Sequence, residues 1–266
     1  MLNDFSNPQA ILTAIDQNYF AFLDTIAGWP QVEICRGEDV TWVLTPDVPQ
    51  MLFNTVYPHD LTSQTDAKIE TLIERYRSRR LPVHWQLNPL TQPDDLGRYL
   101  QRHGLVKAGA SPVMAVALDT VKQDDMPAGL RIERIADAES LRHYSAVFRA
   151  GFEMPDDLMH MIDTTFAAQR LDPAANLQHY VGWLGAEPVA TTSLMLAGGV
   201  AGIWCVTTLE QARGRGIASA MVYKALQDAR VLGYRAGLLV SSAMGYSVYR
   251  RMGFTEFGRL QTYTQP

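Results

Sequence analysis

Hydrophobic and polar positions alternate in blocks along the second half of the chain, and the blocks predict both strands and helices. Apolar residues recur on one stripe over residues 217–232, which predicts an amphipathic helix that Gly233 is placed to end. Three apolar runs separated by short glycine-containing turns, at 178–185, 188–197 and 200–209, predict a meander. The whole order over residues 129–264 is strand, two helices, three-strand meander, helix, strand, helix, strand.

The first half of the chain repeats much of this series. Its pattern predicts a hairpin, a strand, a helix, a strand, a helix and a strand, at residues 31–46, 50–57, 65–81, 82–89, 93–105 and 113–119. A polar segment with Pro and Gly, residues 119–130, lies between two apolar segments and reads as a linker. We therefore expect an α+β protein with two mixed sheets, divided into domains at 1–127 and 128–266.

Composition narrows the function classes. The chain has 266 residues, of which 47% are hydrophobic, and a formal net charge of −5 that disfavours nucleic acid and anionic membranes as partners. No apolar run is long enough to span a membrane and no signal peptide is recognisable, so we expect a cytoplasmic protein. Cys35 and Cys205 lie far apart in apolar segments, and the histidines have no metal-ligand spacing, so no metal is expected.

A glycine loop stands directly before the predicted helix at 217–232. Gly214 and Gly216 permit close backbone approach or a positive φ, and the helix that follows points its unpaired N–H groups and positive dipole end at the same place. Such a place binds anions, although an ordinary loop before a surface helix has the same pattern. The spacing lacks the third glycine and the acidic residue of a Rossmann turn and the Gly-Lys-Ser/Thr of a Walker loop.

Two motifs give the loop a more specific interpretation. Residues 213–218, RGRGIA, fit R-x-x-G-x-A, and residues 249–254, YRRMGF, fit Y-x-x-x-G-F, with one helix and one strand predicted between them. In order and spacing these motifs resemble the acyl-CoA loop and the C-terminal tyrosine element of the GNAT superfamily of N-acetyltransferases. The chain differs in having Glu210 where many members carry proline. The resemblance covers roughly residues 129–264.

The resemblance implies acetyl-CoA as co-substrate and assigns residues to it. Backbone amides of the loop and helix start would hold the pyrophosphate, and the arginines would either add charge or face solvent. The backbone of the preceding strand would pair with the pantetheine arm, and packing in the core is the alternative role of its side chains. The residues concerned are Trp204, Cys205, Val206, Thr207, Arg213, Gly214, Arg215, Gly216, Ile217, Ala218 and Ser219.

Two residues are candidates for proton transfer. Tyr249 matches the family tyrosine that protonates the leaving thiolate, and its alternative role is that of a half-buried aromatic residue covering the sheet. Glu153 lies with Asp156 and Asp157 in the segment that covers the acceptor site in this family and is the candidate general base. The alternative is a solvated helix start, where acidic residues are common.

The first half resembles a degenerate copy of the same unit. Residues 100–105, LQRHGL, align with YRRMGF, so that Leu100 stands at the position of Tyr249, and residues 59–66 contain no glycine before the helix. We therefore predict a tandem GNAT architecture in which 1–127 is degenerate and only 128–266 binds acetyl-CoA. An unrelated α+β domain is the alternative.

Together these observations predict an acyl-CoA-dependent N-acetyltransferase. The amine would attack directly in a ternary complex, because no cysteine or serine stands in a nucleophile–base arrangement. A non-catalytic acyl-CoA sensor is the alternative. The acceptor, a small-molecule or peptide amine, and the oligomeric state follow from no motif.

Overall fold

Contacts within the chain define two compact units, and each is discontinuous in sequence. The computed structural model describes residues 7–29, 32–46 and 53–265. The larger unit comprises residues 1–25 and 114–257, and the smaller unit comprises residues 26–113 and 258–266. These units do not divide the chain at the boundary expected between residues 127 and 128, so the two linear domains stay a prediction.

The larger unit contains a mixed sheet with the strand order β5-β10-β9-β8-β7-β6. Its strands are β6 (Leu130–Arg134), β7 (Leu177–Leu184), β8 (Glu187–Ala197), β9 (Val200–Thr208), β10 (Ala236–Val240) and part of β5 (Val106–Ala117). Strands β6 to β9 are antiparallel neighbours, whereas β10 runs parallel to β9. The predicted meander and the parallel strand after it are therefore confirmed.

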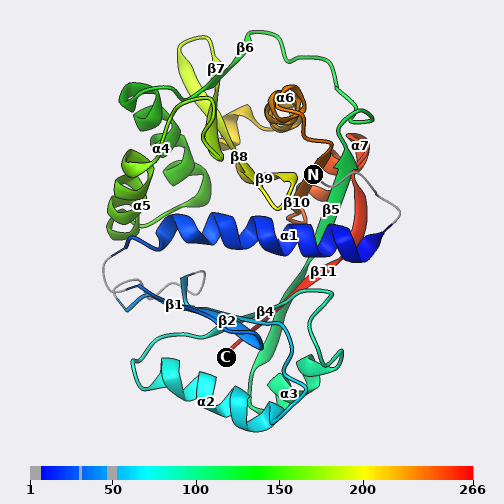
Figure 1. Ribbon diagram of the computed structural model, residues 1–266. Helices are drawn as coiled ribbons and strands as arrows, with labels where there is room; N and C mark the ends of the chain where they lie inside the picture. The colour runs from blue at the N-terminus through cyan, green and yellow to red at the C-terminus, as the bar shows by residue number, and fades with distance from the viewer. Residues whose placement is uncertain (1–6, 30–31, 47–52, 266) are drawn as a thin grey trace. The chain divides into compact units, whose positions relative to one another are not determined.

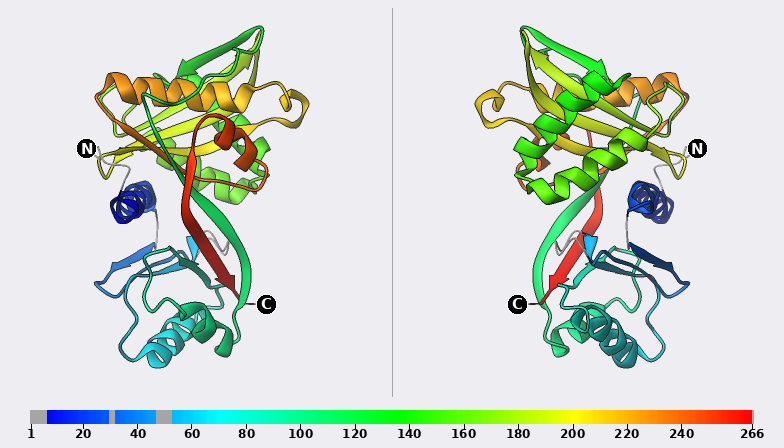
Figure 2. Two further views of the ribbon diagram at one scale, coloured as in Figure 1. Left: turned by 90° about the vertical axis from the view of Figure 1, so that its right-hand side faces the viewer. Right: turned by 90° about the vertical axis from the view of Figure 1, so that its left-hand side faces the viewer.

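Helices cover both faces of this sheet (Figures 1 and 2). Helices α4 (Ala138–Phe152) and α5 (Asp156–Ala168) lie on one face, and α6 (Ile217–Val231) lies on the other. Asp137 caps α4 by accepting from the Ser140 backbone N–H, and Pro155 is the N-cap of α5. Helix α7 (Tyr246–Arg251) follows β10.

An N-terminal helix, α1 (Pro8–Leu23), packs against β8 and β9 and belongs to the larger unit. Asn18, which is 1% exposed, anchors it by donating to the carbonyls of Met195 and Ala197 and accepting from Trp204 Nε1. These bonds join α1 to both strands, and they leave no room for a side chain at Gly202, whose Cβ would lie 1.9 Å from Asn18 Oδ1. The sequence analysis did not predict this helix.

The smaller unit has the strand order β1-β2-β3-β4-β11. Its elements are β1 (Glu33–Arg36), β2 (Val40–Leu44), β3 (Thr55–Pro58), α2 (Thr65–Arg77), β4 (His84–Leu87), α3 (Leu96–Arg102) and parts of β5 and β11 (Thr255–Thr264). Strands β3 and β4 are parallel and joined through α2, just as β9 and β10 are joined through α6. The predicted series is confirmed, although residues 31 and 50–52 of the predicted strands lie outside the described residues.

Strands β5 and β11 each contribute to both units. In the larger unit β5 is the neighbour of β10 and adds Met114 and Val116 to the core, to which Leu118, directly after the strand, also belongs. In the smaller unit β11 pairs antiparallel with β4 and adds Tyr263 to the core. The last strand of each half of the chain thus completes the sheet of the unit formed mainly by the other half.

Candidate acyl-CoA site

A cavity of about 410 Å³ opens in the larger unit where β9 leads into α6. It combines segments that are distant in sequence: the end of α4, the end of β9, the glycine loop and the region around α7. Its lining is Gly151, Phe152, Val206, Thr207, Thr208, Ala212, Arg213, Gly214, Gly216, Ile217, Ala218, Ser219, Ser242, Met244, Gly245, Val248, Tyr249 and Arg251.

The N-terminus of α6 has the features of an anion site. Gly216 is its N-cap in the left-handed conformation, with φ of +77°, and Gly214 has φ of +74°. No side chain caps the helix and no acidic residue lies in its first turn, in contrast to α4, where Asp137 occupies the same donors. The first N–H groups of α6 therefore lie at the cavity without a side-chain acceptor.

The loop forms its turn without the proline that the family often carries. Glu210 begins a single 3-10 turn, in which Ala212 N–H donates to Leu209 O and Arg213 N–H donates to Glu210 O. Arg213 Nε also donates to Thr208 O over 3.0 Å, which ties the loop to the end of β9. Glu210 is therefore compatible with an ordered loop.

Strands β9 and β10 pair over only a short length. Their register joins Ala201 to Gly237 and Gly202 to Leu238. Over both strands, which the structure describes completely, the rest of β9 from Ile203 to Thr208 has no register partner in β10. Backbone along this part of β9 is accordingly open to an extended ligand that adds as a further strand.

A β-bulge interrupts β9 at the place where it separates from β10. The register between β8 and β9 shifts between Thr191 and Ser193, and Cys205 takes a left-handed φ of +52°. Thr191 Oγ1 donates to the Cys205 carbonyl over 2.8 Å. The Trp204 side chain points away from the cavity to α1, where its ring stacks on Phe22 with centroids 4.6 Å apart. The bulge therefore changes the direction of the backbone at Trp204 and Cys205.

A buried polar network lies behind this bulge. Ser193 Oγ is 2.6 Å from Tyr144 Oη and 2.8 Å from His179 Nδ1, and His179 Nε2 is 2.7 Å from Gln169 Oε1. Burial lowers the pKa of His179 to about 3 and raises the pKa of the Cys205 thiol to about 11. Both groups are therefore neutral near pH 7. No local sequence pattern predicts this network, because its members come from separate elements.

Tyr249 lies in the cavity wall with its side chain largely buried. It is 8% exposed, and its ring lies 2.7 Å from the place that a Cβ on Gly245 would occupy, so glycine is needed there. Burial raises the pKa of Tyr249 to about 12, which keeps its hydroxyl protonated. Among the residues that the structure describes, none is a hydrogen-bond partner of this hydroxyl. It remains available as a donor to a ligand.

Glu153 is placed less directly. It is the exposed C-cap residue of α4 with a left-handed φ of +52°, follows the lining residue Phe152, and is not itself in the lining. Asp156 pairs with Arg149, and the side chain of Asp157 lies outside the described part of the chain. The role of Glu153 as general base stays a prediction.

The cavity thus brings together most of the residues singled out by the sequence. Of the predicted residues, the lining contains Tyr249, two of the four in β9 and most of those in the loop. Trp204, Cys205, Arg215 and Glu153 are not part of the lining. The lining residues that were not predicted from the sequence are Gly151, Phe152, Thr208, Ala212, Ser242, Met244, Gly245, Val248 and Arg251. Gly151 had a signal, a glycine in the last turn of a helix, and the structure explains it: a Cβ there would lie 2.2 Å from Thr207 Oγ1.

Comparison with known families decides how the cavity is interpreted. Residues 141–254, which include both the loop and Tyr249, match the model of the acetyltransferase (GNAT) family. Over these residues the chain is similar to the GNAT acetyltransferases. No curated protein matches the chain significantly.

Solved structures extend the likeness in fold to nearly the whole chain. A GCN5-related N-acetyltransferase from Kribbella flavida is 17% identical with a TM-score of 0.70, covering 94% of this chain and 95% of its own. One from Sphaerobacter thermophilus is 19% identical with a TM-score of 0.66, at 97% and 92% coverage. A tandem GNAT protein from the clavulanic acid biosynthesis pathway is 13% identical with a TM-score of 0.61, at 98% and 95% coverage. The predicted GNAT-like, tandem fold is confirmed.

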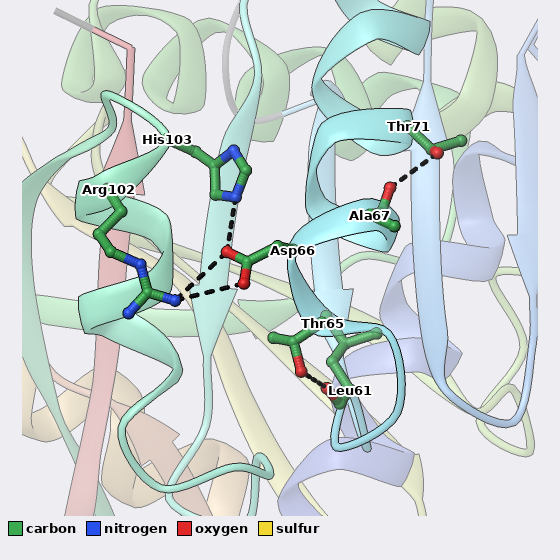
Figure 3. A network of polar contacts seen from close by, with 7 residues as sticks. All are labelled: Leu61, Thr65, Asp66, Ala67, Thr71, Arg102 and His103. Carbon is green, nitrogen blue, oxygen red and sulfur yellow. Dashed lines mark hydrogen bonds and ion pairs between the residues drawn. The ribbon is translucent and has the colours of Figure 1, made fainter.

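The smaller unit retains the outline of the GNAT site but not its chemistry. Gln64, with φ of +54°, starts α2 as Gly216 starts α6. In the first turn of α2, however, Asp66 accepts from Arg102 and lies 2.9 Å from His103 Nε2 (Figure 3). The bond to His103 holds the pKa of Asp66 below its usual value, so a carboxylate stands at this helix start. With Leu100 at the tyrosine position, this geometry supports the prediction that only the C-terminal copy binds the co-substrate.

Within the described residues, no helix is long and apolar enough to cross a membrane. In the same part of the chain no group of three or more His, Cys, Asp or Glu side chains could hold a metal ion.

Proposed function

We propose that the protein transfers an acetyl group from acetyl-CoA to a primary amine by direct attack in a ternary complex. The single observation that carries this proposal is one cavity that contains the uncapped start of α6, the open part of β9 and the buried hydroxyl of Tyr249. The match of residues 141–254 to the GNAT acetyltransferase family model supports acetyl-CoA as the donor.

The described residues fit acetyl-CoA. Its pyrophosphate would accept from backbone N–H groups between Gly214 and Ser219, where no side-chain cap or acidic group competes. Its pantetheine arm would pair with β9 backbone at Val206 and Thr207, and this direction brings the thioester toward the bulge at Cys205. Arg213, which also lines the cavity, adds positive charge beside the phosphates.

The chemistry then requires one bond to form and one to break. The neutral amine attacks the thioester carbonyl, the C–N bond forms, and the C–S bond breaks as the thiolate leaves. Because Tyr249 stays protonated, its hydroxyl donates a hydrogen bond and then the proton to the sulfur as charge develops there. The proton lost by the amine passes to Glu153 or, through water, to solvent, and a proton from solvent restores the Tyr249 hydroxyl, so that the products are the amide and the CoA thiol.

Direct attack agrees with the state of the nearby thiol. Cys205 is half-buried at the bulge, and desolvation of its thiol raises the pKa to about 11, so the thiolate needed for a covalent acetyl intermediate is scarce near pH 7. Ser193 forms hydrogen bonds with Tyr144 and His179, but its side chain is fully buried and is not part of the cavity lining, so it is not exposed to the thioester.

The experiment that tests the proposal compares Tyr249→Phe with the wild type and with Tyr234→Phe, a tyrosine packed against the same core but outside the cavity lining. Thiol release from acetyl-CoA with an amine panel should fall by about 10²–10⁴ in kcat for Tyr249→Phe alone. Calorimetric affinity for acetyl-CoA should stay within about threefold of wild type, because phenylalanine keeps the ring.

The loss should shrink when the acyl donor carries a more acidic thiol, since that thiolate needs less protonation. If Tyr249→Phe keeps the full kcat, Tyr249 is not the proton donor and only lines the cavity. Tight acetyl-CoA binding without turnover of any amine by the wild type would favour the alternative function, an acyl-CoA sensor.

A further inference from the structure

Two large apolar side chains line the cavity and yet remain exposed to solvent. Phe152, the last residue of α4, is 40% exposed, and Met244, in the segment between β10 and α7, is 73% exposed. They belong to the part of the lining that is neither the pyrophosphate loop nor β9. With acetyl-CoA along β9 and the loop, as proposed, this is the part of the lining that is left for the acceptor.

Packing fixes the position of Phe152. Its ring contacts the ring of Phe148, which is buried, with centroids 4.8 Å apart. The preceding residue, Gly151, lies so close to Thr207 of β9 that a Cβ would not fit between them. The end of α4 is thus held against the strand proposed to bind pantetheine. Met244 is unbranched and adaptable, which suits a surface that closes over apolar groups of varied shape.

Charge in the lining excludes another class of acceptor. Arg213 and Arg251 are the charged residues of the lining, and no Asp or Glu is among its described residues. A second ammonium on the acceptor would find no carboxylate among the lining residues, and Arg251 is the lining guanidinium that is not assigned to the pyrophosphate. The net charge of −5 on the whole chain does not supply a local partner for it.

We propose that the acceptor is a monoamine with an apolar group next to its amine, and that Phe152 and Met244 select it. This inference rests on the proposed acetyltransferase function and narrows its substrate class. Polyamines and aminoglycosides, which carry several positive charges, are excluded as preferred acceptors. The apolar part of the acceptor covers the two exposed side chains while its amine points at the thioester.

A matched pair of probes tests the selection. Hexylamine and 1,6-diaminohexane have the same six-carbon chain and differ at the far end, where one has a methyl group and the other an ammonium group. Wild-type kcat/KM should be at least tenfold higher for hexylamine. Phe152→Ala should lower that ratio at least threefold, mainly by raising KM for hexylamine, and leave the calorimetric affinity for acetyl-CoA within twofold.

Val231→Ala is the control, because Val231 is an 85% exposed apolar residue of α6 outside the lining, and it should leave the ratio unchanged. Equal or better use of 1,6-diaminohexane, or a ratio unaffected by both Phe152→Ala and Met244→Ser, would overturn the inference while leaving acetyl transfer intact. If the protein binds acetyl-CoA but acetylates neither probe and no amine of a wider panel, the proposed acetyltransferase function, on which this inference rests, would be refuted.

Discussion

Gly216→Val separates the cost of a strained backbone from the loss of a binding surface. Gly216 has φ of +77°, and a Cβ placed there meets only Pro127 Cγ at 3.8 Å and Ser219 Oγ at 3.9 Å, which are ordinary contacts. The folded protein therefore has room for the side chain. Its cost in unfolding free energy is the left-handed conformation, about 1–2 kcal/mol for an L-residue.

Binding should suffer in addition to this strain. The valine methyl groups would extend from the N-cap of α6 into the space where the pyrophosphate must approach backbone N–H groups. We expect the acetyl-CoA affinity to fall at least tenfold, which is about 1.4 kcal/mol. Isothermal titration calorimetry measures the affinity, and urea denaturation measures the strain in the same variant.

Gly185→Val provides the matched control. Gly185 has φ of +61°, has no atom within 4 Å of a built Cβ, and lies in the turn between β7 and β8 outside the cavity lining. It should lose similar stability and keep full affinity. A folded Gly216→Val protein that binds acetyl-CoA as tightly as the wild type would refute the assignment of the pyrophosphate site, and an equal loss in Gly185→Val would show that strain alone explains the effect.

Three further predictions concern the larger unit. Burial lowers the folded-state pKa of His179 to about 3, against an unfolded value near 6.5, so its contribution to stability is present above pH 6.5 and falls by about 1.4 kcal/mol per pH unit as the pH decreases toward 3. In urea denaturation at pH 7, 6 and 5, the unfolding free energy of His179→Gln should therefore decrease less with falling pH than that of the wild type. Parallel decreases in the two proteins would contradict this prediction. Residues 128–266 expressed alone lack α1 and the side chains of β5 that are buried in the larger unit, and burial of each large apolar side chain contributes about 1.5–3 kcal/mol to stability. This fragment should therefore show no cooperative unfolding by circular dichroism. Asn18→Leu removes the hydrogen bonds of Asn18 to two carbonyls and an indole N–H, and should lower the unfolding free energy measured in urea by at least about 2 kcal/mol. Gln17→Leu, on the exposed face of the same helix, should change this free energy little.

Local signals explain what the sequence could predict. Strand and helix periodicity, the Asp137 cap and the glycine loop are each determined by a few neighbouring residues, and the structure contains all of them. Helix α1 had such a signal too, since Asn7 caps it and Pro8 stands in its first turn. Apolar and aromatic residues on several of its faces obscured the periodicity.

Features that depend on distant partners could not be read in this way. Cys205 has no local reason to adopt a positive φ, and its conformation is explained only by the bulge against β8 and the bond from Thr191. Likewise the pattern of residues 113–119 predicts a strand but not its neighbour. That β5 lies beside β10 rather than completing the first half is a matter of tertiary pairing.

The attachment of α1 sets the order of events when the chain is synthesised. The hydrogen bond from Asn18 to Met195 can form only after 177 further residues have been synthesised. At about 5–20 residues per second this takes roughly 10–35 s, far longer than a helix needs to form. Throughout that interval the apolar face containing Ile11 and Ile15 has no sheet to cover it. The nascent chain therefore presents a hydrophobic helix that a chaperone at the ribosome can hold until the meander has been made.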